Sequence, residues 1–530
     1  MSSSTQHLQP SFDEIGCLVP PSPALEEKII ATRRVLARGQ ELPQAPSGDL
    51  LDLRMYTRLL TRSPATRADT LVSGRTALAP VIGTRRVIVL LVDFPDMAGA
   101  RSRDDIHKLL FSQGMQASGS MREYFAEASG GKLDVTGEVH GWLRAPQPKA
   151  YYTNGDNGFG AYPRNAQRLV EDVLGLADGA VDFSSFDNDG DGLIEALVLI
   201  AAGSGAEVTG NADDIWSHKW SIAPKLVDGR KVTAYFMAPE DGRVGVMAHE
   251  LGHLLLGMPD LYDIDYSSRG TGSWDLMAGG SWNNGGDTPA HPCAWVKAKV
   301  GWASIDTVID AEKDIVLPPY ATSNAVVRLP VGDAGSKQYF LLSNRRRQGF
   351  DAHIPGEGML IEHVDENQLN NTDEAHYLVD VEQCDGRQDL NKNANAGDAG
   401  DLWPGGGQDR FTAGTTPGSL AYDGSDSRIE VTAIARDGDN VTARVRAGLV
   451  SGGGATGFAW HNNKKVVQAF TSADAQNAWA NIEGLGWRRV RPGAGDGVTN
   501  LFGMLCEALA NERPVHVHAD GLVIDIAYLN

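Results

Sequence analysis

Two histidines and a glutamate lie close together in the run GVMAHELGHLLLGMPDLYD, which extends from Gly245 to Asp263. His249 and His253 are four residues apart, so an α-helix would place them on one face. Two imidazole nitrogens on one helix face can bind a zinc ion at about 2.0–2.1 Å. Glu250 follows the first histidine and can reach a water on that ion without being a ligand. This spacing predicts general-base catalysis beside a bound metal.

The residues around this motif predict a buried helix. Residues 244–248 and 254–256 are apolar or glycine, which makes the helix apolar nearly all round. Polar side chains in such a helix are costly unless they have partners, so the three polar residues indicate a function. Gly257 ends the helix, and Pro259 prevents it from resuming.

The third ligand has two candidates, Asp260 and Asp263. No glutamate occurs between Glu250 and Glu312, which argues against a site with a downstream glutamate ligand. The common order H-E-x-x-H-x-x-G-x-x-H is altered here, because three residues rather than two separate His253 from the glycine, and an aspartate replaces the last histidine. We favour Asp260 as the ligand. Asp263 is the alternative, or a partner that orients a histidine.

A methionine follows in a glycine-rich turn. The run GSWDLMAGGSW contains Met277, and the order of zinc helix, glycine turn, third ligand and methionine turn is that of a metzincin. Met277 is expected to form an apolar floor beneath the metal and not to be a ligand. No tyrosine follows Met277 at the spacing that some metzincins use for oxyanion support, so that role is unassigned.

These residues resemble the M6 family of metallopeptidases, the immune inhibitor A-like proteases. The H-E-L-G-H…P-D-L-Y-D run and the W-D-L-M turn carry the resemblance, which extends from about residue 81 to 447. It implies a zinc endopeptidase that acts on proteins or peptides and is secreted. Other similar segments are Val87–Asp96, Met121–Val139, Phe186–Gly192, Asp213–Trp220 and Leu341–Asp351.

An N-terminal cysteine suggests a latent form. Cys17 precedes Leu-Val-Pro-Pro, and its thiolate could take the open zinc position at about 2.3 Å, which resembles the cysteine switch of other metzincins. The alternative is an ordinary thiol. The first residues have neither a basic n-region nor an apolar h-region, so they do not form a Sec signal, and the export route stays open.

A second cation site is predicted in the run Asp187-Asn-Asp189-Gly-Asp191-Gly. Alternating oxygens around a tight glycine turn suit calcium. An EF-hand would need a glutamate at the twelfth position, where Val198 stands, so this is a calcium-type loop outside that pattern. An Asp/Gly-rich surface turn is the alternative.

Length and composition predict a multidomain protein of 530 residues, in which 42% of residues are hydrophobic and 22% charged. A net charge of −21 argues against nucleic acid as a partner. No apolar run approaches the roughly 18–20 residues of a membrane span. The four cysteines are far apart, so neither a disulfide framework nor a cysteine-type zinc site is expected.

The pattern of elements predicts a mixed fold with five parts. Buried strands at residues 87–92 and 196–202, with helices between them, indicate an α/β (α+β) metzincin-like domain. Short strands at turn-rich spacing then indicate an antiparallel β-sandwich-like domain, and a small α+β module follows a glycine-rich linker. The predicted parts are an N-terminal extension or pro-region 1–80, the protease domain 81–305, the β-rich domain 306–448, the linker 449–457 and the C-terminal module 458–530.

The sequence therefore predicts a zinc endopeptidase with His249, His253 and Asp260 as ligands and Glu250 as general base. A calcium-stabilised binding protein with a degenerate protease fold is the alternative, supported by the altered ligand spacing and the extra C-terminal module. We expect the C-terminal module to bind a partner. The natural substrate, the activation site and the oligomeric state are not readable.

Overall fold

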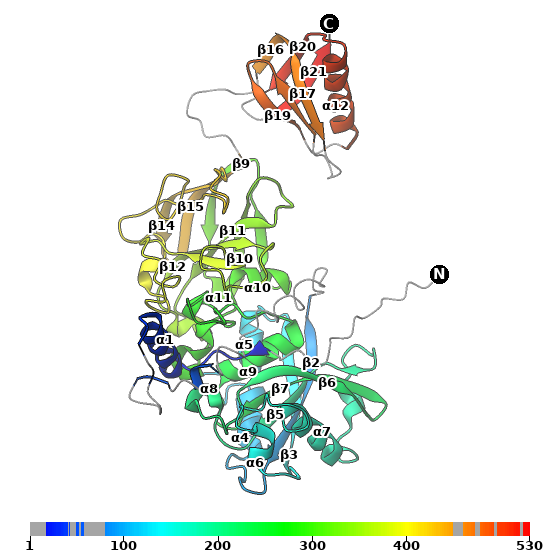
Figure 1. Ribbon diagram of the computed structural model, residues 1–530, viewed down its shortest axis with the longest axis vertical. Coiled ribbons are helices and arrows are strands. Elements are labelled where there is room, and N and C mark those ends of the chain that lie inside the picture. Colours follow the sequence, from blue (N-terminus) through cyan, green and yellow to red (C-terminus); the bar gives the residue numbers. More distant parts are fainter. Residues whose placement is uncertain are drawn as a thin grey trace. The chain divides into compact units, whose positions relative to one another are not determined.

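The computed structural model describes residues 17–40, 42, 49–51, 55–57, 80–448, 459–471, 478–491, 495–519 and 523–529 (Figure 1). The chain divides into two compact units, residues 1–448 and 449–530. The linker predicted at 449–457 lies outside the described residues, as does much of the predicted extension. Within the described part, none of the helices has the length and apolar character needed to cross a bilayer.

The first unit is built around a seven-stranded sheet of order β1-β6-β7-β5-β2-β3, with β4 beside β7. The central strands are parallel, whereas β6 runs antiparallel to β7 and β1 antiparallel to β6. The strands are β1 (Cys17–Leu18), β2 (Gly83–Asp93), β3 (Leu133–Arg144), β4 (Leu193–Ile194), β5 (Leu197–Ala201), β6 (His218–Val227) and β7 (Arg230–Pro239).

The two buried strands predicted from apolar runs are confirmed as β2 and β5. Residues 87–92 in β2 and 197–200 in β5 have no exposed surface. Strands that are covered on both faces need apolar side chains at successive positions, which is why the runs are continuous and do not alternate.

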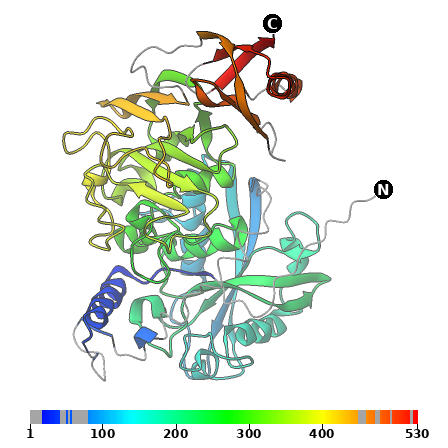
Figure 2. The ribbon, with the colours of Figure 1, turned by 45° about the horizontal axis from the view of Figure 1, so that its top comes forward.

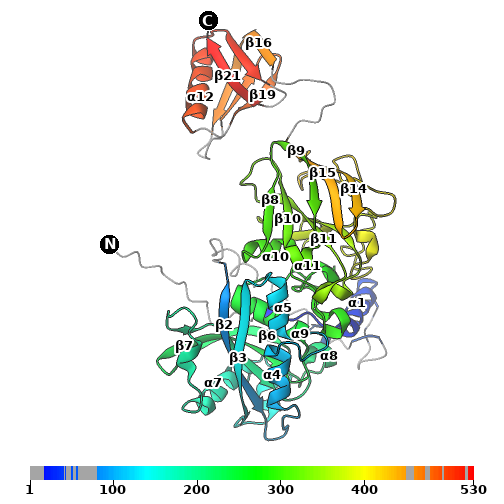
Figure 3. The same ribbon diagram turned by 180° about the vertical axis from the view of Figure 1, so that it is seen from behind.

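Helices of the first unit cover this sheet (Figure 3). Ser120 caps one of them, and Glu123 completes a capping box. Asn165 caps another through its side chain. The α-helices are α1 (Pro23–Ala37), α4 (Arg103–Phe111), α5 (Met121–Ala128), α6 (Lys149–Thr153), α7 (Ala166–Ala177), α8 (Ala206–Thr209), α9 (Val244–Leu251), α10 (Ala294–Lys299) and α11 (Tyr320–Ser323).

Short helical turns follow α9 and surround the later loops. η2 is a π-helix, and the others are 3-10 turns. They are η1 (Phe183–Phe186), η2 (Gly252–Leu256), η3 (Gly272–Trp274), η4 (Gly279–Gly286), η5 (Gly349–His353) and η6 (Ala399–Asp401).

Two further sheets of the first unit share one hydrophobic core. The five-stranded sheet has the order β13-β12-β11-β10-β8, and the three-stranded sheet has the order β14-β15-β9. The strands are β8 (Ser304–Thr307), β9 (Ala311–Leu317), β10 (Ala325–Pro330), β11 (Gln338–Arg345), β12 (Gly358–Asp365), β13 (Val379–Glu382), β14 (Glu430–Asp437) and β15 (Asn440–Ala447).

Strand β11 of the five-stranded sheet is buried on both faces. In β11, Phe340 and Leu342 belong to the core shared with the three-stranded sheet, whereas Tyr339 and Leu341 belong to the core of the seven-stranded sheet. Side chains alternate between faces along a strand, so one strand contributes to both cores. Strand β11 thus joins the core of the seven-stranded sheet to the core shared by the two later sheets.

The second unit is a six-stranded sheet of order β16-β20-β21-β19-β18-β17 with one helix. Val490, Leu505 and Val517 are among the buried side chains that pack the helix against the sheet. The elements are β16 (Ala459–Lys464), β17 (Val466–Thr471), β18 (Ala478–Ile482), β19 (Gly486–Val490), α12 (Gly495–Ala510), β20 (Val515–Ala519) and β21 (Val523–Leu529).

Candidate metal centre

The helix with the two histidines changes its winding between His249 and His253. α9 ends at Leu251 and continues as the π-helix η2, in which the N–H of Gly257 donates to the carbonyl of Gly252. A π-turn holds one residue more than an α-turn. The extra residue between His253 and the glycine is therefore absorbed, and Gly257 ends the helix with a φ of 65°.

This winding brings Asp260 to the histidines. Its Oδ1 lies 3.2 Å from Nε2 of His249 and 3.0 Å from Nε2 of His253, and the two Nε2 atoms are 2.9 Å apart. Asp263 lies elsewhere: its buried carboxylate accepts hydrogen bonds from Asp265, Ser267 and Ser268. Of the two candidate ligands, only Asp260 faces both imidazoles.

The hydrogen bonds on the far side of each imidazole fix its tautomer. Nδ1 of His249 lies 3.0 Å from the carbonyl oxygen of Leu276, and Nδ1 of His253 lies 2.6 Å from that of Met258. A carbonyl only accepts, so each Nδ1 carries a proton, and in the neutral form of the ring the lone pair of Nε2 is directed at Asp260. Two lone pairs and a carboxylate oxygen converge, which fits a bound cation.

The pKa shifts in the cluster indicate the same demand for positive charge. Burial would lower the pKa of His253, but the charges of Cys17 and Asp260 outweigh burial and raise it well above its usual value. Burial would raise the pKa of Asp260, but the two histidines outweigh it and hold this pKa at about 2. A divalent cation bound at this position would supply the positive charge that both pKa shifts indicate.

Glu250 is the buried acid next to the first histidine. Its side chain has no exposed surface, and neither carboxylate oxygen has a hydrogen-bond partner among the described residues. Burial raises the pKa of Glu250 well above its usual value. A buried carboxylate without a hydrogen-bond partner has no evident structural role, and a role in proton transfer would explain why it is there.

Met277 lies beneath the helix. It is fully buried, and its backbone N–H donates to Asp275 while its carbonyl accepts from Leu261. A Cβ added at Gly252 would lie 3.3 Å from its sulfur atom, so the thioether packs against the helix between the two histidines. This contact makes Met277 an apolar support and leaves the Nε2 side of the imidazoles to Asp260.

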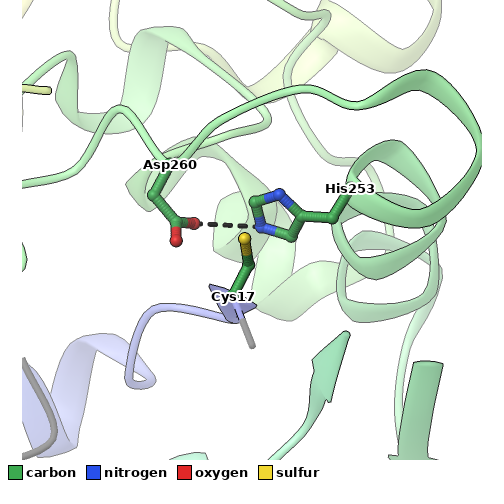
Figure 4. A group of neighbouring side chains, drawn as sticks. All are labelled: Cys17, His253 and Asp260. Carbon is green, nitrogen blue, oxygen red and sulfur yellow. Dashed lines mark ion pairs between the residues drawn. The ribbon is translucent and has the colours of Figure 1, made fainter. Parts of the chain in front are cut away.

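Cys17 reaches the same cluster from the N-terminal segment (Figure 4). Its Sγ, a ring nitrogen of His253 and a carboxylate oxygen of Asp260 all lie within 4.8 Å of one another. Burial would raise the pKa of the thiol, but the charge of His253 outweighs it and the pKa is lowered. The thiol is thus placed where a fourth ligand could bind.

In the predicted calcium loop, the carboxylates that lie together are not the three aspartates indicated by the spacing in the sequence. Oxygens of Asp187, Asp189 and Glu195 lie within 4.8 Å of one another. Asp191 is not in this group, and its carboxylate accepts a hydrogen bond from the N–H of Leu193. Asp187 also pairs with Arg230 at 2.6 Å, which already supplies one positive charge.

Three side chains near the candidate metal centre make contacts that the zinc-binding motif does not predict. The hydroxyl of Tyr262 donates to the carbonyl of Leu18, and the indoles of Trp216 and Trp282 donate to the next two carbonyls, those of Val19 and Pro20. Tyr262 stands inside the P-D-L-Y-D run, but its contact is with a residue 244 positions earlier in the chain. Spacing within the motif does not show such a contact.

The residues around this centre are similar to a known family of peptidases. Residues 79–303 match the immune inhibitor A peptidase M6 catalytic domain. This match supports the resemblance to M6 metallopeptidases seen in the sequence. The match ends before the β-rich region, so the likeness predicted for residues 304–447 stays a prediction.

The chain is similar to two kinds of bacterial protein. It is 38% identical over 200 residues to immune inhibitor A of Bacillus thuringiensis subsp. alesti, which covers 31% of this chain and 28% of that protein. It is 31% identical over 271 residues to the pre-pro-metalloprotease PrtV of Vibrio cholerae serotype O1, which covers 40% of this chain and 29% of that protein. The chain thus spans less than a third of the length of these relatives.

Proposed function

We propose that the protein is a zinc-dependent endopeptidase that hydrolyses protein substrates and is made in a latent form. The observation that carries the proposal is the convergence of the Nε2 atoms of His249 and His253 with Oδ1 of Asp260 at 2.9–3.2 Å. The carbonyl partners of both Nδ1 atoms and the match of residues 79–303 to the M6 catalytic domain support it.

His249, His253 and Asp260 would hold the ion. A Zn²⁺ bound there would polarise the scissile carbonyl as a Lewis acid and acidify water. Glu250 would take a proton from the attacking water and deliver it to the nitrogen of the leaving amine. The burial of Glu250 supports this role, because exclusion of solvent raises its pKa toward the value that a base working near neutral pH needs.

Latency would come from the N-terminal segment. The support is the position of the Cys17 thiol beside His253 and Asp260, together with the burial of residues 17–22. A calcium ion held by Asp187, Asp189 and Glu195 is a further part of the proposal, and it rests on the proximity of those carboxylates.

Exchange of the base is the direct test. In a Cys17→Ser background, Glu250→Ala should lower casein cleavage by about 100-fold or more while zinc stays bound, since general acid–base catalysis contributes roughly 10²–10⁴-fold. Glu171→Ala, on the surface of α7, is the matched control and should cleave like its parent. Retained cleavage in Glu250→Ala would remove the glutamate from the mechanism.

Metal analysis of the same preparations separates the enzyme from the binding protein with a degenerate fold. About one zinc per chain, with cleavage that a chelator abolishes and added zinc restores, supports the peptidase. Calcium alone, without zinc or cleavage, would support the binding protein.

A further inference from the structure

Residues 17–22 lie extended against the edge of the seven-stranded sheet. Cys17 pairs with Lys219 and Leu18 with His218 in an antiparallel register with β6, and the N–H of Val19 donates to the carbonyl of Ser217 at 3.3 Å. Every residue of this segment is buried. An extended chain that adds a strand to a sheet edge is one of the general ways in which proteins bind peptides.

Three successive carbonyls of the segment each accept a side-chain hydrogen bond. Tyr262 donates to Leu18 at 3.0 Å, while the indole N–H groups of Trp216 and Trp282 donate to Val19 and Pro20 at 2.9 Å each. These donors contact main-chain oxygens, which every peptide has. The segment therefore marks the path of a peptide backbone through the centre, whatever its side chains.

The Leu18 carbonyl is the one that lies at the candidate metal site. Its oxygen is 3.3 Å from Nε2 of His249, and that nitrogen has no proton to donate because Nδ1 carries it. The hydroxyl of Tyr262 donates a hydrogen bond to this oxygen at 3.0 Å. Tyr262 is thus the donor beside the position where a carbonyl meets the metal ligands.

Tyr262 is held by the same loop that places Asp260. The buried carboxylate of Asp263 accepts from Ser267 and Ser268 and so closes the loop just after the tyrosine. The ring of Tyr262 also stacks on that of Tyr266, with 6.4 Å between centroids. A donor fixed in this way needs little reorientation when charge develops on its acceptor, so the free-energy cost of reorganisation is small.

We propose that Tyr262 is a catalytic residue whose hydroxyl donates a hydrogen bond to the scissile carbonyl oxygen of a peptide substrate bound along β6. Water adds to the carbonyl carbon, the π electrons of the C=O bond move onto oxygen, and Tyr262 stabilises that oxyanion. The C–N bond then breaks, and the proton taken by Glu250 goes to the amine. The inference rests on the proposed peptidase function and fills the oxyanion role that the sequence left unassigned.

The test compares Tyr262→Phe with Tyr266→Phe in the Cys17→Ser chain. Tyr262→Phe should lower kcat by about 100-fold, as loss of an oxyanion donor does, with KM changed by less than about threefold. It should also weaken binding of a phosphinate analogue of Ala-Leu-Val-Pro by about 10-fold or more, measured by calorimetry. A hydrogen bond to an anionic oxygen is about twice as strong as one to a neutral carbonyl, so the loss falls on these two quantities.

Tyr266→Phe removes the hydroxyl of the stacked neighbour and should leave kcat and phosphinate affinity within about threefold of the parent. Zinc content should match in all chains, and the Tm of Tyr262→Phe should fall by no more than about 3 °C, because the buried Leu18 carbonyl loses its donor. An active parent with unchanged kcat in Tyr262→Phe would overturn this inference alone. A zinc-loaded parent that cleaves nothing would overturn the peptidase function and this inference with it.

Discussion

Asp260 and Asp263 stand close together in one loop, yet their surroundings give them different roles. Asp260 faces two imidazole nitrogens, and its pKa is held at about 2. Asp263 accepts hydrogen bonds from its own loop, and burial raises its pKa to about 6. The first environment suits a metal ligand, and the second suits a residue that closes a turn.

The two roles predict opposite outcomes for the two alanine variants. Asp260→Ala should lose most of its zinc on dialysis, with little change in the Tm of the metal-free chain. Asp263→Ala should retain zinc better but lower stability by about 1–3 kcal/mol, because buried donors lose their acceptor. Zinc analysis and calorimetry of both chains measure this. A reversal, with zinc lost only in Asp263→Ala, would assign the ligand to Asp263.

The sequence predicted these residues only as far as local geometry reaches. His249, Glu250 and His253 share one helix, so their spacing sets their relative positions. Asp260 was one of two candidates. The sequence shows an extra residue between His253 and Gly257, but it does not show whether the helix there winds as an α- or a π-turn. The contact of Tyr262 depends on the register of β1 on β6, which no local pattern encodes.

At the level of elements, α9 must lie very close to the turn η4 that follows the methionine. A Cβ added at Gly245 would come within 1.8 Å of the carbonyl oxygen of Ser281, so the helix reaches its place only with glycine there. Helix boundaries and buried strands were predictable from capping residues and apolar runs. The close approach of these two backbones was not predictable from the sequence, because a glycine inside a helix does not indicate which residues it contacts.

Gly245→Ala should therefore lower the stability of the first unit by about 3 kcal/mol, since a backbone carbonyl cannot move aside as a side chain can. Calorimetry should show a Tm lower by about 3 °C. Gly175→Ala is the matched control, because Gly175 lies on the exposed side of α7 with nothing within 4 Å of an added Cβ. That variant should gain about 0.5–1 kcal/mol. Equal effects in the two helices would contradict the close approach.

Over the whole first unit, the N-terminal segment is tied down well beyond its thiol. Figure 2 shows α1 in dark blue, with the extended residues before it leading into the unit. Arg33 pairs with Asp265 at 2.7 Å, and Arg269 pairs with both Glu26 and Glu27. The sequence predicted the role of the cysteine, whereas these ion pairs join residues more than 200 positions apart and follow only from the assembled fold.

This distribution of contacts predicts that loss of the thiol activates the chain in part. Cys17→Ser removes the proposed fourth ligand, but the hydrogen bonds of residues 18–22 and the ion pairs of α1 remain. The unprocessed variant should cleave a casein peptide about 10-fold faster than the unprocessed wild type and remain slower than a chain from which the segment has been removed. Cys506→Ser, in the second unit, is the matched control and should stay latent. Equal latency in Cys17→Ser and wild type would show that the backbone of the segment alone blocks the candidate metal centre and that the thiol does not contribute.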